Sequence, residues 1–188
     1  MRWILIVIIL IVVVLGVTYV VGHKYNMQDI GFNNPLATAM FKQTGATDIH
    51  LAVIKGDYDN LLKLINKGVD VNVRTDDGST PLHYGCSLGR IKCVELLLDN
   101  GANINVQDDS GYTPLATAAY SGNPEIVELL LSRGADTDIK NNGGYTPLQV
   151  VLKFEEAFSS NPVVNKTFSA QKKNLETCAQ LLRDHGAK

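Results

Sequence analysis

The sequence predicts an all-α repeat fold, a solenoid of helix-turn-helix units joined by hairpin loops and preceded by one transmembrane helix. Two observations predict it. A period of 33 residues runs through most of the chain, and an uncharged apolar segment lies near its N-terminus. Self-similarity at such a period is typical of stacked supersecondary units, each of which buries its apolar face against the next.

Glycine, one variable residue and threonine mark the start of each unit. The glycines are Gly45, Gly78, Gly111 and Gly144, and the threonines are Thr47, Thr80, Thr113 and Thr146. A second series keeps the same spacing about 23 residues after the first three starts, at Gly68, Gly101 and Gly134. Four units exceed the roughly three that a solenoid needs to bury a continuous core.

Residues 78–110 illustrate the content of one unit. Thr80 is a helix N-cap residue, and Pro81 occupies a first-turn position, where its missing N–H costs no hydrogen bond. Gly89 ends this first helix, and the apolar residues between 93 and 98 predict a second helix that ends at Gly101. The polar residues 102–109 form the return loop.

The repeated residues resemble the ankyrin repeat. Its Thr-Pro-Leu-His start is matched by TPLH at 80–83, and its leucine-rich helix and following turn are matched by VELLLDNGANIN at 94–105 and IVELLLSRGADTD at 126–138. The resemblance covers roughly residues 43–188 and implies an ankyrin-repeat domain of four repeats. Polar substitutions in the first and fourth units indicate caps that face water.

The N-terminal segment from Trp3 to Gly22 carries no charged side chain. Twenty helical residues span about 30 Å, the thickness of a bilayer's hydrocarbon core, so residues 1–22 are predicted to form a transmembrane anchor. The alternative is a cleaved signal peptide, which would have a shorter apolar region and small residues at its cleavage point. Residues 23–42 then form a linker, in which Asn34-Pro35-Leu36 starts a short capping helix.

Few charges flank this apolar segment. Arg2 and the terminal amine precede it, and Lys24 follows it. The positive-inside rule then places the N-terminus in the cytoplasm and the repeat domain outside it, in a periplasm or a lumen. If the segment were cleaved instead, the domain would be a secreted or periplasmic protein.

The fourth unit carries an insertion at about residues 155–173. Thr146 and Gly186 lie 40 positions apart, whereas Thr80 and Gly101 lie 21 apart. Glu155 stands where the other units have a glycine stop, so the first helix of this unit should run on through residue 158 before Pro162 breaks it. The insertion is either a longer capping helix or a dedicated recognition element, because insertions in repeats often form part of the binding face.

The composition indicates neither a nucleic-acid partner nor catalysis. Seventeen basic and nineteen acidic residues give a net charge of −2, without a basic run. We find no constellation of nucleophile, base and metal ligands, so we expect no enzyme, no cofactor and no metal. Cys86, Cys93 and Cys178 fall at apolar repeat positions and are predicted to be buried, although a Cys86–Cys93 bridge stays open in an oxidising compartment.

The resemblance also implies a binding surface, because ankyrin repeats bind other proteins through their hairpin tips and inner helix face. Carried over position by position, the expected partner-binding residues are Asp76, Asp77, Ser79, Leu88, Asp109, Ser110, Tyr112, Tyr120, Tyr145, Lys153 and Phe154. Leu88, Tyr120 and Phe154 are larger and more apolar than a solvated helix face requires. His50 and His83 take the family's structural role, which is hydrogen bonding within the repeat.

Two acidic pairs, Asp76-Asp77 and Asp108-Asp109, come close to recurring in register. Stacking would align them along one edge of the hairpin row. They are either an acidic stripe for a basic partner or a weakly bound cation, or ordinary solvated turn carboxylates.

The sequence therefore predicts a membrane-tethered adaptor or inhibitor that binds an unidentified protein through its concave face, as a monomeric repeat domain. Two alternatives stay open. One is an envelope immunity or inhibitor protein, and the other is an accessory subunit that completes an enzyme site.

Overall fold

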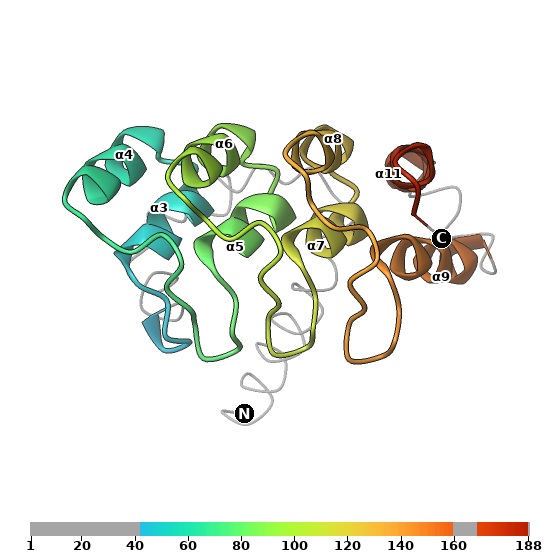
Figure 1. The fold of residues 1–188 in the computed structure, drawn as a ribbon, viewed down its shortest axis with the longest axis horizontal. Helices are drawn as coiled ribbons and strands as arrows, with labels where there is room; N and C mark the ends of the chain where they lie inside the picture. The colour runs from blue at the N-terminus through green and yellow to red at the C-terminus, as the bar shows by residue number, and fades with distance from the viewer. Residues whose placement is uncertain (1–41, 160–168, 188) are drawn as a thin grey trace, which may run out of the picture.

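The computed structural model describes residues 42–159 and 169–187, which form two stacked rows of helices (Figure 1). The described helices are α3 (Asp48–Lys55), α4 (Tyr58–Asn66), α5 (Pro81–Ser87), α6 (Ile91–Asp99), α7 (Pro114–Ser121), α8 (Pro124–Ser132), α9 (Pro147–Ser159) and α11 (Ser169–Asp184). We call α3, α5, α7 and α9 the inner row, and α4, α6, α8 and α11 the outer row. Hairpin loops after α4, α6 and α8 project side by side from the inner row (Figure 1).

Threonine caps begin the inner helices, as the repeat pattern predicts. Thr113 Oγ1 accepts a hydrogen bond of 3.2 Å from the backbone N–H of Ala116. In α5, the backbone N–H of Thr80 donates to His83 Nδ1 at 3.2 Å, and a proline follows the cap. These contacts satisfy N–H groups that the first turn of a helix leaves without intrahelical partners.

The inner helices end where a left-handed glycine stops them, and the exception is α9. Gly56 follows α3 with φ 69°, and Gly122 follows α7 with φ 68°. Glu155 replaces this glycine in α9, which has 13 residues where α7 has 8. The predicted extension of this helix through residue 158 is therefore confirmed.

One buried cluster runs through the helix pairs that the structure describes. Its members include Leu82, Leu115 and Val151 in the inner row, and Leu61, Leu97, Leu130 and Leu182 in the outer row. Their apolar faces meet between the two rows, so each helix pair supplies one layer of a continuous core. Of the predicted apolar positions at 93–98, Leu97 is fully buried, whereas Leu96 and Leu98 are partly buried at its edge.

The three cysteines are buried and free, which confirms their prediction as core residues. Burial raises the pKa of Cys86, and burial followed by Glu125 raises that of Cys178 to about 12. Both thiols therefore stay protonated at neutral pH and pack as small apolar groups.

The first helix pair divides its apolar and polar residues between the two rows. Six consecutive residues of α3, from Ile49 to Ile54, are buried. The polar residues at 57–60 instead lie at the start of α4, where they are exposed. These exposed polar residues agree with the predicted N-terminal cap, which stays a prediction.

Several predicted features lie outside the described residues. These are the anchor at 1–22, the linker and capping helix at 23–41, and the loop around Pro162. Among the helices that the structure does describe, none combines the length and the hydropathy that a bilayer span requires.

The extension of α9 places Glu155 against α11 in a partly buried position. Its Oε1 atom is buried and has no hydrogen-bond partner among the described residues. Burial raises the pKa of this carboxyl group, Glu176 raises it further, and Arg183 and Lys172 lower it. The folded protein therefore favours the protonated form of Glu155 more than the unfolded chain does.

Glu155→Gln is expected to raise stability at neutral pH. The pKa of Glu155 is higher in the folded protein than in the unfolded chain, so ionisation of this group costs more in the folded state. The free energy of unfolding therefore falls as pH rises from the unfolded pKa to the folded pKa, and it stays lower above that pH. Glutamine keeps the shape but cannot ionise. Thermal melts between about pH 4 and about pH 8 should therefore show a gain over wild type that grows with pH.

Glu156→Gln is the matched control, because Glu156 is the exposed neighbour on the same helix. If Glu155→Gln and Glu156→Gln changed the melting temperature equally at every pH, the assignment of a destabilising charge to Glu155 would be wrong.

Candidate functional site

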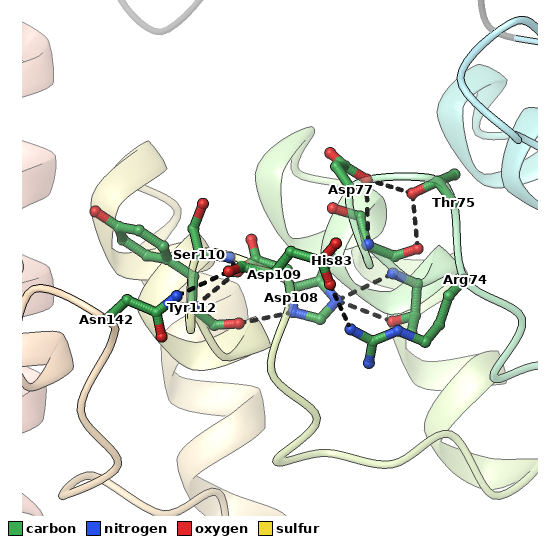
Figure 2. Close-up of polar contacts among 11 residues, drawn as sticks. Arg74, Thr75, Asp77, His83, Asp108, Asp109, Ser110, Tyr112 and Asn142 are labelled. Carbon is green, nitrogen blue, oxygen red and sulfur yellow. Dashed lines mark hydrogen bonds and ion pairs between the residues drawn. The ribbon is translucent and has the colours of Figure 1, made fainter.

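Successive hairpin loops are tied together by a repeating backbone hydrogen bond. Each bond is 3.0 Å long, and the three run from Asp76 N–H to Thr44 O, from Asp109 N–H to Asp77 O, and from Asn142 N–H to Ser110 O. The side-chain amide of Asn142 also donates to Asp109 O at 2.8 Å (Figure 2). This spacing aligns equivalent hairpin residues along one edge of the solenoid.

His83 links the second helix pair to the hairpin loop after α6. Its Nδ1 accepts from the backbone N–H of Thr80, so its Nε2 carries the proton and donates to Tyr112 O at 3.0 Å (Figure 2). Burial lowers the pKa of His83, and the bond to Tyr112 opposes this. The neutral ring has the predicted structural role, and it also fixes the backbone beneath the Tyr112 side chain.

Carboxylates of the predicted acidic stripe are partly used by their own hairpins. Asp108 Oδ1 accepts from the backbone N–H groups of Ser110 at 2.9 Å and Tyr112 at 2.8 Å. Asn141 makes the same pair of contacts in the next hairpin, which shows that the position needs an acceptor and not a charge. Asp77 Oδ1 likewise accepts from Ser79 N–H at 3.2 Å.

Asp109 forms an ion pair of 3.2 Å with Arg74 of the preceding hairpin (Figure 2). Both side chains are exposed, so the pair contributes about 0–1 kcal/mol to stability. The carboxylates of Asp77, Asp108 and Asp109 all contact other groups of the protein. These contacts favour the interpretation of the acidic pairs as turn carboxylates over a binding stripe. In the described part of the chain, no three His, Cys, Asp or Glu side chains are grouped as metal ligands would be.

Three aromatic side chains from different elements meet on the inner row. The ring centroids of Tyr112 and Tyr120 are 6.5 Å apart, and those of Tyr120 and Phe154 are 4.7 Å apart. All three side chains are half-buried. Burial raises the pKa of Tyr120, and Tyr112 raises it further. We call these three residues the aromatic row.

Lys153 and Tyr145 form a second contact beside the aromatic row, because Lys153 precedes Phe154 on α9. The Lys153 Nζ atom donates to the Tyr145 hydroxyl at 2.6 Å and lies 4.0 Å from the centre of the Tyr145 ring. A cation over an aromatic face is attracted by the ring's negative face. The exposed lysine is therefore held in one place.

The structure separates the predicted binding residues into two groups and one single residue. The hairpin group is Asp76, Asp77, Ser79, Asp109 and Ser110. The inner-row group is Tyr120, Lys153 and Phe154 on α7 and α9, together with the hairpin residues Tyr112 and Tyr145 whose side chains contact them. Leu88, the C-cap residue of α5, is half-buried and belongs to neither group.

Sequence reasoning missed Tyr84 on the inner row. Its ring packs edge-on against His50, with centroids 5.6 Å apart and an interplanar angle of 81°. Thr117 and Val150 occupy the same place in the next two units, so the repeat pattern offers no signal for an aromatic residue here.

Sequence reasoning also missed a set of hydrogen bonds from side chains to backbone carbonyls at the ends of the inner helices. Arg90 Nη2 donates to Ile54 O at 3.2 Å, Asn123 Nδ2 to Cys86 O at 2.8 Å, and Gln171 Nε2 to Ser121 O at 3.0 Å. Each tie joins one helix pair to the C-terminal end of the preceding inner helix. These contacts fix the helix ends that carry Tyr120 and its neighbours.

A groove of about 720 Å³ lies away from this face, between α4 and α6 of the outer row. It is lined by Gly56, Asp57, Tyr58, Asp59, Lys92, Glu95, Leu96 and Asp99. Asp57 caps α4 by accepting from Asn60 N–H, and Asp99 pairs with Arg133. Because its lining is mostly charged and partly engaged in these contacts, we favour the inner row as the functional face.

Comparison with known proteins supports the repeat assignment. A family model described as ankyrin repeats (3 copies) matches residues 18–108, 49–141 and 106–158. No curated protein matches the chain.

Proposed function

The chain belongs to the ankyrin-repeat family, and on that premise we propose that it is a membrane-tethered, non-enzymatic module that binds a protein partner on its inner row. Ankyrin repeats generally bind protein partners, and solenoids of this kind present extended concave surfaces for that purpose. The proposed surface comprises the aromatic row with Tyr145 and Lys153. We also propose that α9 and α11 form a fourth ankyrin repeat.

The aromatic row is the observation that carries the proposal. Tyr120 and Phe154 contact each other from α7 and α9, yet both remain partly accessible. Aromatic side chains at a partly exposed position supply large contact area with little loss of conformational freedom, and they dominate the energetics of protein interfaces. A face that served only to cover the core would not need three aromatic rings in contact with solvent.

Site-specific photo-crosslinking in native membranes tests the binding face and can identify the partner. Benzoylphenylalanine placed at Ser110, an exposed hairpin residue two positions before Tyr112 of the proposed face, should crosslink one protein. The same probe at Glu128, an exposed residue on the outer helix of the next unit, should not. Crosslinking from Glu128 alone would move the interface to the outer row.

We further propose that residues 3–22 anchor the protein in a membrane and that the repeat domain lies outside the cytoplasm. The proposal is supported by the uncharged apolar length of that segment and by the flanking Arg2. Membrane tethering would keep the binding face close to the bilayer and raise its local concentration near a membrane partner.

A carbonate wash of isolated membranes tests the anchor. The full chain should remain in the pellet, and a chain that starts at Asp29 should be soluble. If expression of the full-length gene gave a soluble protein that is shortened at its N-terminus, the segment would be a cleaved signal peptide instead. Because the native cysteines are buried and free, Lys67→Cys can report the side of the membrane with an impermeant thiol reagent.

A further inference from the structure

We propose that the inner face of the third and fourth helix pairs selects an acidic peptide segment, in which a carboxylate lies next to a large apolar side chain. This inference rests on the proposed binding function and names the chemistry of the partner. It follows from the contact between Lys153 and Tyr145 and from the position of that contact beside the aromatic row.

Lys153 and Tyr145 together present two hydrogen-bond donors to one point. The Tyr145 hydroxyl accepts from the Lys153 ammonium group at 2.6 Å, so the phenolic proton is left to donate outward. The ammonium group has three N–H bonds and uses one of them in this contact. A carboxylate only accepts hydrogen bonds, and it can accept from both donors at once.

The position of the Lys153 charge is set before any partner arrives. Its ammonium group lies 4.0 Å from the centre of the Tyr145 ring and is bonded to the hydroxyl of the same residue. A free lysine loses much rotamer entropy on binding, and a lysine already held in place loses less. Among the described residues no carboxylate lies within ion-pair distance of Lys153, so its charge stays available.

The aromatic row adds the apolar half of the recognition. Phe154 follows Lys153 directly on α9, and its ring lies 4.7 Å from that of Tyr120. Both rings are half-buried, which leaves part of each available to a side chain of the partner. Burial of a large apolar residue against them would stabilise the complex, and it would shield the carboxylate–ammonium pair from water.

The surrounding charges disfavour a basic segment. The nearby hairpin carboxylate of Asp109 is already paired with Arg74 at 3.2 Å. Glu155 and Glu156 follow Lys153 closely on α9; Glu155 is partly buried against α11, and Glu156 is exposed. A lysine or arginine in the partner would meet the Lys153 charge, and juxtaposed like charges suppress binding.

Selection of a phage-displayed random peptide library on the full chain in detergent tests the inference. Wild-type protein should enrich peptides with Asp or Glu adjacent to a large apolar residue. Lys153→Glu should enrich Lys or Arg at that position instead. For the tightest acidic peptide, Lys153→Gln should raise the Kd about tenfold, the usual scale of one charge-assisted contact.

Tyr120→Ala/Phe154→Ala is the second selection target, and it separates the two proposals. Two outcomes would overturn this inference and leave the proposed binding face intact. In one, the enriched peptides depend on the aromatic row but share no acidic residue. In the other, Lys153→Glu enriches the same peptides as the wild-type protein. Enrichment of the same peptides by wild type and by the double variant would overturn both. Because Lys153 is exposed, its variants should keep the wild-type circular dichroism spectrum.

Discussion

Leu97→Ala and Leu130→Ala are each expected to lower the free energy of unfolding by about 2–5 kcal/mol. The two leucines occupy the same position in consecutive units, on α6 and α8, and both are 0% exposed. Alanine removes apolar contacts and leaves a cavity that neighbouring helix pairs can fill only in part. Because each unit is stabilised by its neighbours, the loss should affect the whole stack. Urea denaturation followed by circular dichroism measures it.

Leu129→Ala is the matched control for Leu130→Ala. Leu129 is adjacent in the same helix but only partly buried, so its truncation should cost clearly less. Arg183→Leu should not destabilise, because Arg183 is exposed on α11. Equal losses at Leu129 and Leu130 would show that the core face of α8 is assigned wrongly.

Gly111→Ala is expected to have the second large effect, about 2–5 kcal/mol. Gly111 has φ 81°, and a β-carbon there would lie 2.6 Å from the backbone nitrogen of Asn142 in the next hairpin. Left-handed backbone costs a non-glycine residue about 1–2 kcal/mol, and overpacking typically adds about 1–3 kcal/mol. Asn142 N–H is also the donor that ties these hairpins together, so relief of the clash must disturb that bond.

Gly134→Ala separates the two causes. Gly134 has φ 84°, but a β-carbon there would meet nothing within 4 Å. This variant should therefore lose only the backbone cost of about 1–2 kcal/mol. If both glycine variants unfolded at the same urea concentration, the close approach of the hairpins would contribute nothing to stability.

The sequence was sufficient to predict features that repeat. A glycine or threonine that recurs at each 33-residue step reports a local backbone requirement, such as the cap at Thr80 or the stop at Gly122. The extended α9 was also predictable, because Glu155 breaks that recurrence at one identifiable position. In both cases the physical cause lies within a few residues of the signal.

Contacts between side chains of different units were harder to predict. Register places Tyr120 near Phe154, but the packing of their rings depends on side-chain rotamers that a single sequence does not reveal. The Lys153–Tyr145 contact lies within the fourth unit, but it depends on side-chain rotamers in the same way. Burial of α3 on all sides was missed because burial depends on what surrounds a helix, and the local pattern reports only the helix itself.

Direct titration of the crosslinked partner against the wild-type chain and three variants tests the central claim, that the aromatic row is the binding face. Tyr120→Ala/Phe154→Ala should raise the Kd at least about 30-fold, which corresponds to about 2 kcal/mol. Tyr120→Leu/Phe154→Leu is the companion variant that preserves packing, because Phe154 also touches the core. Glu95→Ala/Glu128→Ala, on the exposed outer row, should change the Kd less than about threefold. Wild-type affinity in a folded Tyr120/Phe154 variant would contradict the claim.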